Sequence, residues 1–160
     1  MPATYEPIAT TTLGTTQNQV DFNTISGSYT DLILIFNGGV TSTGDIWLRM
    51  NSDTGSNYSR TRLTGDGSTA ASTRNSAASS IFISAGTVGA TANAIISIQN
   101  YSNATTYKTT LARFNSSTYA VASTGLWRST SAITSLSLRA DSADTFTSGS
   151  IFTLYGIKAA

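Results

Sequence analysis

Apolar and polar residues alternate in short segments along the chain, and clusters of Gly, Asn, Ser and Asp separate these segments. Such a pattern is typical of β-strands joined by turns. No segment carries a sustained helical period with caps at both ends, so we expect little helix. The pattern predicts strands near residues 5–13, 19–25, 31–37, 45–51, 57–64, 79–85, 92–101, 107–114, 118–128, 132–140 and 150–158.

The segment from residue 45 to residue 50 shows how the alternation assigns faces. Every second residue is apolar, so we expect Ile46, Leu48 and Met50 to point to one side of a strand. Trp47 and its polar neighbours then point to the other side. The second tryptophan, Trp127, is expected in the core.

The number and shortness of the predicted strands decide the fold class. Ten or eleven short strands in one open sheet would leave too many apolar residues in water, whereas two antiparallel sheets packed face to face bury them. We therefore expect an all-β, jelly-roll-like sandwich that forms a single domain over residues 1–160. The continuous apolar run 32–36 predicts a strand covered on both faces, and 65–80, which lacks large apolar residues, predicts a long exposed loop.

Composition narrows the function. The net charge is +1, which gives no electrostatic signal for nucleic acid. Cysteine and histidine are both absent, so disulfides, thiolate chemistry and the usual general base and metal ligand are missing as well. The N-terminus has no signal-peptide pattern, and no apolar run is long enough to cross a bilayer. We expect a soluble, whole gene product, made inside a cell, with no cofactor, no metal and no membrane insertion.

Few acidic residues could perform catalysis. Asp53 and Asp66 lie on adjacent predicted loops and could form the carboxylate pair of a polysaccharide hydrolase, although both stand in typical turn sequences. The segment beginning at Asn51 faintly resembles a calcium loop, but its glycine comes one position early and its twelfth position is Arg62. A Ser–Lys dyad would need one of the two lysines, at positions 108 and 158. We expect the chain not to be an enzyme.

One constellation of aromatic and basic residues stands out. Trp47 shares its predicted face with Arg49, while Tyr58, Arg60 and Arg62 line one side of the following strand. If the two strands pair, these residues form a patch on an outer face. Aromatic residues with arginine favour protein interfaces and also suit stacking on sugars. Three interpretations of Trp47 remain open: a protein interface, a core position and a sugar site.

Several segments resemble small virion proteins of tailed phages that infect marine bacteria and cyanobacteria. The resemblance runs nearly end to end, but the shared residues look like strand and turn positions, so it implies no catalytic residues. It implies a particle protein: a capsid decoration or knob protein, or a short fibre component. The segments that carry it are Ser26 to Leu32 (SGSYTDL), Asp53 to Ser59 (DTGSNYS), Leu126 to Ser135 (LWRSTSAITS) and Phe152 to Ala160 (FTLYGIKAA).

These observations lead to a ranked set of expectations. The first is a virion structural protein, made in the host cytoplasm, that decorates the capsid by binding other virion proteins, such as the major capsid protein. It would also bind its own copies as a homo-oligomer, with a trimer as one option. The alternative is a tail-fibre or receptor-binding module that contacts host surface glycans. A polysaccharide hydrolase is the remote alternative.

Overall fold

The computed structural model describes residues 4–42, 44–84, 91–141 and 143–158. Its described residues form strands, turns and irregular segments without a helix. The strands are β1 (Tyr5–Thr12), β2 (Gln19–Phe22), β3 (Asp31–Gly38), β4 (Ile46–Met50), β5 (Tyr58–Gly65), β6 (Ala70–Ala78), β7 (Ile81–Phe82), β8 (Ala92–Gln99), β9 (Lys108–Ser116), β10 (Ala120–Trp127), β11 (Leu136–Ala140) and β12 (Ile151–Ile157).

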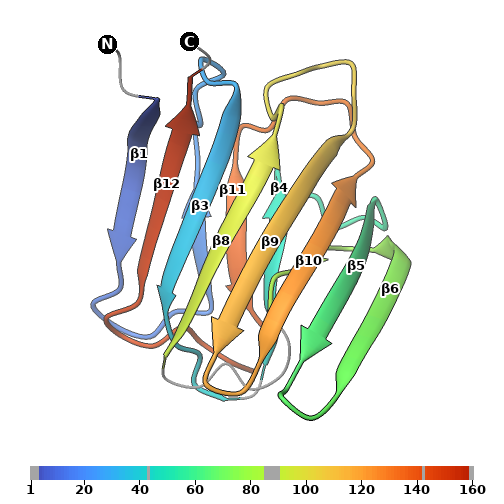
Figure 1. The fold of residues 1–160 in the computed structure, drawn as a ribbon. Helices are drawn as coiled ribbons and strands as arrows, with labels where there is room; N and C mark the ends of the chain where they lie inside the picture. Colours follow the sequence, from blue (N-terminus) through green and yellow to red (C-terminus); the bar gives the residue numbers. More distant parts are fainter. Residues whose placement is uncertain (1–3, 43, 85–90, 142, 159–160) are drawn as a thin grey trace.

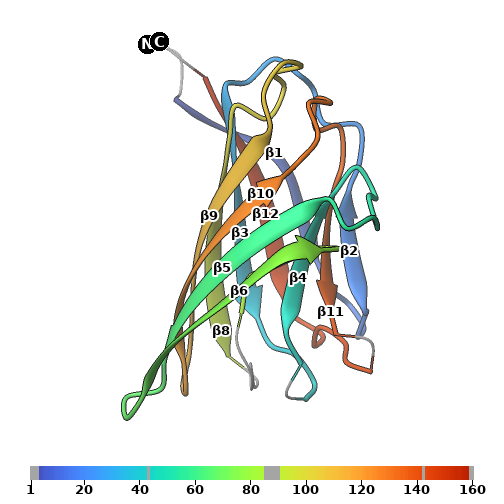
Figure 2. The ribbon, with the colours of Figure 1, turned by 90° about the vertical axis from the view of Figure 1, so that its right-hand side faces the viewer.

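Two antiparallel sheets of unequal width make up the fold. The large sheet has eight strands in the order β1-β12-β3-β8-β9-β10-β5-β6, and the small sheet has four in the order β2-β11-β4-β7. Figure 1 shows the large sheet from its outer side with the small sheet behind it, and Figure 2 shows the two layers from the side. The prediction of a two-sheet antiparallel β-sandwich is confirmed. The described part of the chain contains twelve strands, against the ten or eleven predicted.

The core lies between the inner faces of the two sheets. Along β4 the expected side of Ile46, Leu48 and Met50 is fully buried, and it belongs to one core cluster with the inward residues of β3 and β8 from the large sheet. Gly125 of β10 packs directly against β7, because a Cβ atom there would lie 2.4 Å from Cδ1 of Ile81. Only glycine fits this approach without displacing β7.

The apolar run at residues 32–36 is covered on one face, so the prediction for both faces is wrong. Leu32, Leu34 and Phe36 are fully buried, whereas Ile33 and Ile35 are half-buried on the outer face of the large sheet. That face is open along its length in Figure 1. Large neighbouring side chains on the same face, rather than a further layer, shield the two isoleucines in part.

The segment 65–80 is not a long loop. Residues Ala70–Ala78 form β6, which pairs with β5 through a tight hairpin. Asp66 closes the turn, because its carboxylate accepts hydrogen bonds from the backbone N–H groups of Ser68 and Thr69, at 2.8 and 2.6 Å. The strand lacks large apolar residues because it lies beyond the small sheet and is exposed on both faces from Ala70 to Ala77.

Candidate binding surface

The strands that carry Trp47 and Arg60 do not pair with each other, so the condition set for an outer patch is not met in that form. β4 pairs with β11 and β7 in the small sheet, whereas β5 pairs with β10 and β6 in the large sheet. Asn51 to Asn57 therefore connect one sheet to the other instead of closing a hairpin. The residues still meet in part, because β5 runs along the flank of the sandwich beside β7 (Figure 2).

Tyr58 does not belong to any outer patch. Its side chain is fully buried, and its hydroxyl accepts a hydrogen bond from the N–H of Met50 at 3.1 Å. The same hydroxyl also contacts the carbonyl oxygens of Met50 and Asp53. Burial raises the pKa of Tyr58 to about 12, so the phenol is neutral at physiological pH. Tyr58 is a core residue that ties β5 to the end of β4.

Trp47 and Arg49 lie on the outer face of the small sheet, as predicted from the alternation along β4. Neighbouring strands add residues directly opposite them: Phe82 of β7 and Arg139 of β11 stand beside Trp47, and Ser137 stands beside Arg49. The Trp47 and Phe82 rings lie 5.8 Å apart between centroids. Antiparallel partners share a face, so one row of side chains crosses the sheet from Arg139 to Phe82.

Arg60 and Arg62 reach this row from the other sheet. The Cζ atoms of Arg60 and Arg62 lie 3.3 and 5.0 Å from the centroid of the Phe82 ring, which is cation–π geometry. Backbone and side-chain acceptors hold both guanidinium groups in place. Arg60 donates to the carbonyl of Ser80 at 2.9 Å, and Arg62 forms an ion pair with Asp45 at 3.1 Å. The two arginines thus extend the outer face of the small sheet around its β7 edge.

We call this surface the arginine–aromatic face. Its members are the aromatic and cationic side chains of the small sheet's outer side and of the adjoining flank of β5: Trp47, Arg49, Arg60, Arg62, Phe82 and Arg139. Four of the five residues singled out from the sequence belong to it, and Tyr58 does not. Phe82 and Arg139 were missed, although each alternates with buried apolar neighbours in a predicted strand, which is the signal that would have found them.

A hollow of about 210 Å³ opens at the centre of this face, between Trp47 and two arginines. Within the described ranges, Arg49 and Arg139 form hydrogen bonds through Nε, to the carbonyl of Ser79 and to Oδ1 of Asn18. Their terminal nitrogens have no acceptor among residues 4–42, 44–84, 91–141 and 143–158, which leaves them for a partner. The indole Nε1 of Trp47 is shielded from solvent and has no acceptor among the described residues. The hollow is lined by Gln19, Trp47, Arg49, Ser52, Thr54, Ser137 and Arg139.

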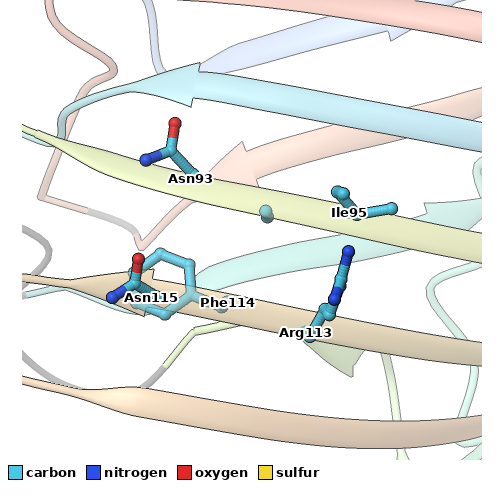
Figure 3. A pocket seen from close by; sticks show the side chains of 6 residues that line it. Asn93, Ile95, Arg113, Phe114 and Asn115 are labelled. Carbon is cyan, nitrogen blue, oxygen red and sulfur yellow. The ribbon is translucent and has the colours of Figure 1, made fainter.

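The outer side of the large sheet, which faces away from the small sheet, has a second hollow with fewer charged and aromatic groups. Figure 3 shows it between β8 and β9, where Ile95 and Arg113 stand opposite each other and Asn93 faces Asn115. It provides one cation and two amides, and the Phe114 ring belongs to the core, with 2% of its surface exposed. The arginine–aromatic face combines more charge with two partly exposed rings.

The carboxylates Asp53 and Asp66 do not come together. They flank opposite ends of β5, which at eight residues spans roughly 26 Å. A glycosidase pair has to lie within about 10 Å. Asp53 instead accepts a hydrogen bond from Trp127 Nε1 at 2.7 Å. Partial burial opposes its ionisation, but hydrogen bonds from Trp127, Asn57 and Gly55 outweigh that effect and lower its pKa.

The two lysines have structural partners. Lys108 is fully buried and donates to the carbonyls of Thr106 and Thr130, at 2.7 and 3.2 Å, and burial lowers its pKa. Lys158 forms an ion pair with Glu6 at 2.8 Å. Among the described residues, no group of three or more acidic side chains could hold a metal ion. In the same ranges, no helix is long and apolar enough to cross a membrane.

Comparison with known proteins adds no relative, since no family model, curated protein or solved structure matches the chain.

Proposed function

We propose that this chain is a non-catalytic structural protein of a phage particle, a capsid decoration or knob protein that attaches through its arginine–aromatic face. The observation that supports it is the gathering of Trp47, Phe82 and four arginines on one outer face. Aromatic rings and arginine are enriched in protein interfaces, where they are the commonest energetic anchors. The assignment to a phage rests on the segments that resemble virion proteins.

The chemistry of this face defines its partner. The four arginines outnumber the carboxylates beside them, which are Asp45, paired with Arg62, and Asp21, hydrogen-bonded to Ser137. A complementary surface would offer carboxylates to Arg49 and Arg139 and an apolar contact to the two rings. An acidic patch on the major capsid protein meets this description. Because charges contribute to such a contact, salt should weaken it.

Particles of the encoding phage assembled without this protein provide the test. Purified chain is added, and bound protein is measured by sedimentation and located by imaging. The wild type should bind the capsid, and Arg49→Glu should abolish binding at physiological salt. Arg113→Glu, which places the same charge change on the opposite outer face, is the matched control and should bind normally. Equal binding by both variants, or density at the tail tip only, would refute the capsid proposal.

A second candidate is a receptor-binding module of a tail fibre that contacts host surface glycans. The hollow beside Trp47 favours it, since an indole face, two guanidinium groups and several hydroxyls suit a carboxylated sugar. On an array of acidic and neutral glycans, the wild type should then bind acidic members, and Trp47→Ala should lose them while remaining folded. Absence of binding to any acidic glycan would eliminate this candidate and leave the capsid proposal intact.

A further inference from the structure

The strand β6 forms one edge of the large sheet. Its one hydrogen-bonded neighbour among the described strands is β5, and all residues from Ala70 to Ala77 are exposed. Figure 1 shows β6 at the opposite edge from β1, and Figure 2 shows the β5–β6 hairpin projecting beyond the small sheet. A free edge offers a row of unpaired backbone groups to any other strand.

The two edges of the large sheet are built differently. β1 contains Pro7, which has no N–H to donate, and its register with β12 shifts between Pro7 and Ala9. Both features are common protections against pairing with another chain. β6 lacks proline and carries one charge, on Arg74. Its register with β5 is regular from Ala70 to Asn75. Only the β1 edge is therefore blunted.

The turn that begins β6 determines which backbone groups are free. The N–H of Asp66 donates to the carbonyl of Thr69 at 3.2 Å, so these two residues form a hydrogen-bonded pair. Hydrogen-bonded and non-hydrogen-bonded pairs alternate along an antiparallel ladder. Ala71, Thr73 and Asn75 therefore bond to β5. The free edge consists of the backbone groups of Ala70, Ser72 and Arg74, which point away from β5.

We propose that β6 pairs with β6 of a second copy of this chain, antiparallel, about a two-fold axis at Ser72. This register places Ser72 opposite Ser72 of the second copy and Ala70 opposite Arg74 of the second copy. All three outward residues of each strand then meet outward residues, which gives about six backbone hydrogen bonds, two per pair. The result is one continuous sheet across both copies, closed by the two-fold symmetry.

Side chains and chain path both favour a second copy as the occupant. In this register, each Arg74 lies beside an alanine, and the two arginines are about 13 Å apart along the strands. The small residues at 70 and 72 leave room for them on the outer face. The first and last strands, β1 and β12, lie at the far edge, with β1 roughly 33 Å from β6, so neither is placed to cover it. The inference is independent of the proposed attachment to a capsid.

A proline at the two-fold axis tests the pairing. Ser72→Pro removes an N–H that points away from β5, so the hairpin itself keeps its ladder. By light scattering on a sizing column, the wild type should have twice the 16.7 kDa mass of one chain, and Ser72→Pro should have the single mass. Ser72→Ala, which keeps the N–H, is the matched control and should remain dimeric. Circular dichroism establishes that all three are folded.

Two outcomes of this experiment would overturn the proposal: a wild type that is monomeric at high concentration, or a Ser72→Pro variant that is folded and still dimeric. The register is tested separately, because the chain contains no cysteine of its own. Ser72→Cys should be linked to its copy by a short bismaleimide in high yield. Ala77→Cys, on the same strand but five residues from the axis, should not. Linkage at Ala77→Cys alone would contradict the axis at Ser72.

Discussion

Two aromatic pairs occupy opposite situations in this molecule. Tyr58 and Trp127 stack in the core with ring centroids 6.4 Å apart, and Trp127 Nε1 donates to the carboxylate of Asp53. Trp47 and Phe82 lie 5.8 Å apart on the outside of the small sheet, and Trp47 Nε1 has no acceptor in the described part of the chain. The rings are chemically alike, but the polar surroundings differ.

The difference separates a residue pair that stabilises the fold from one available for contact. Tyr58 and Trp127 belong to the large sheet, and their hydrogen bonds reach Met50 and Asp53 at the end of the small-sheet strand β4, so this pair joins the sheets. A shielded N–H without an acceptor costs free energy in the isolated chain. At Trp47 no described residue offsets that cost, whereas at Trp127 the carboxylate of Asp53 does.

The largest expected loss of stability is at the buried pair, Tyr58 and Trp127. Trp127→Phe removes the bond from Nε1 to the Asp53 carboxylate and leaves a gap in the core, so the free energy of unfolding should fall by about 3 kcal/mol. Urea unfolding followed by circular dichroism measures it. Loss of the bond should also return the pKa of Asp53 toward its ordinary value. A decrease below about 1 kcal/mol would mean that the pair does not join the sheets.

A somewhat smaller loss in the free energy of unfolding should appear at alkaline pH, where Tyr58 ionises. The pKa of Tyr58 is raised from 10.0 to about 12, so the unfolded chain loses this proton first. The stabilising contribution is fully present below pH 10 and is lost between pH 10 and about 12, and it amounts to about 2 kcal/mol. Urea unfolding at pH 9 and pH 11.5 should show the decrease. In Tyr58→Phe, which is itself less stable, the decrease should be smaller by most of this amount, while the other six tyrosines contribute equally to both proteins.

The smallest change in stability is expected at the outer pair, Trp47 and Phe82. Trp47→Phe makes the same chemical change as Trp127→Phe, but it removes an N–H that has no acceptor within the described residues. The smaller ring loses some contacts, which lowers stability, while removal of the unsatisfied N–H raises it. The free energy of unfolding should change by less than about 1 kcal/mol. Comparing the two variants in the same urea titration isolates the contribution of the hydrogen bond to Asp53. Equal losses in both would erase the distinction between the pairs.

The sequence predicted strands well wherever a strand buries one face. Burial on one side imposes alternation, and β4, with Leu48 between Trp47 and Arg49, is the plainest case. β6 was predicted as a loop because it buries neither face, so no apolar periodicity marks it. Pairing was harder to predict. The turn-rich segment after Met50 looks like a hairpin connection, yet it crosses between sheets, and only the packing of the whole sandwich determines that.

The candidate surface was predicted in part for the same reason. Tyr58, Arg60 and Arg62 do share one side of β5, as the alternation indicated. At Tyr58 this side of β5 faces the core, whereas at the two arginines it faces the flank of the sandwich. One face of a single strand is therefore buried at one end and partly exposed at the other. Strand periodicity gives the side of a residue but not what lies opposite it.

The order of strands in the large sheet has a consequence for how the chain folds during synthesis. β1 pairs with β12, and β3 lies between β12 and β8, so the first described strand needs the last described strand as its partner. Hairpins such as β8–β9–β10 can close at once from neighbouring residues, whereas closing the β1–β12 pair orders a loop of nearly the whole chain. We expect a slow step that waits for the synthesis of β12, during which β3 presents an uncovered apolar edge to chaperones.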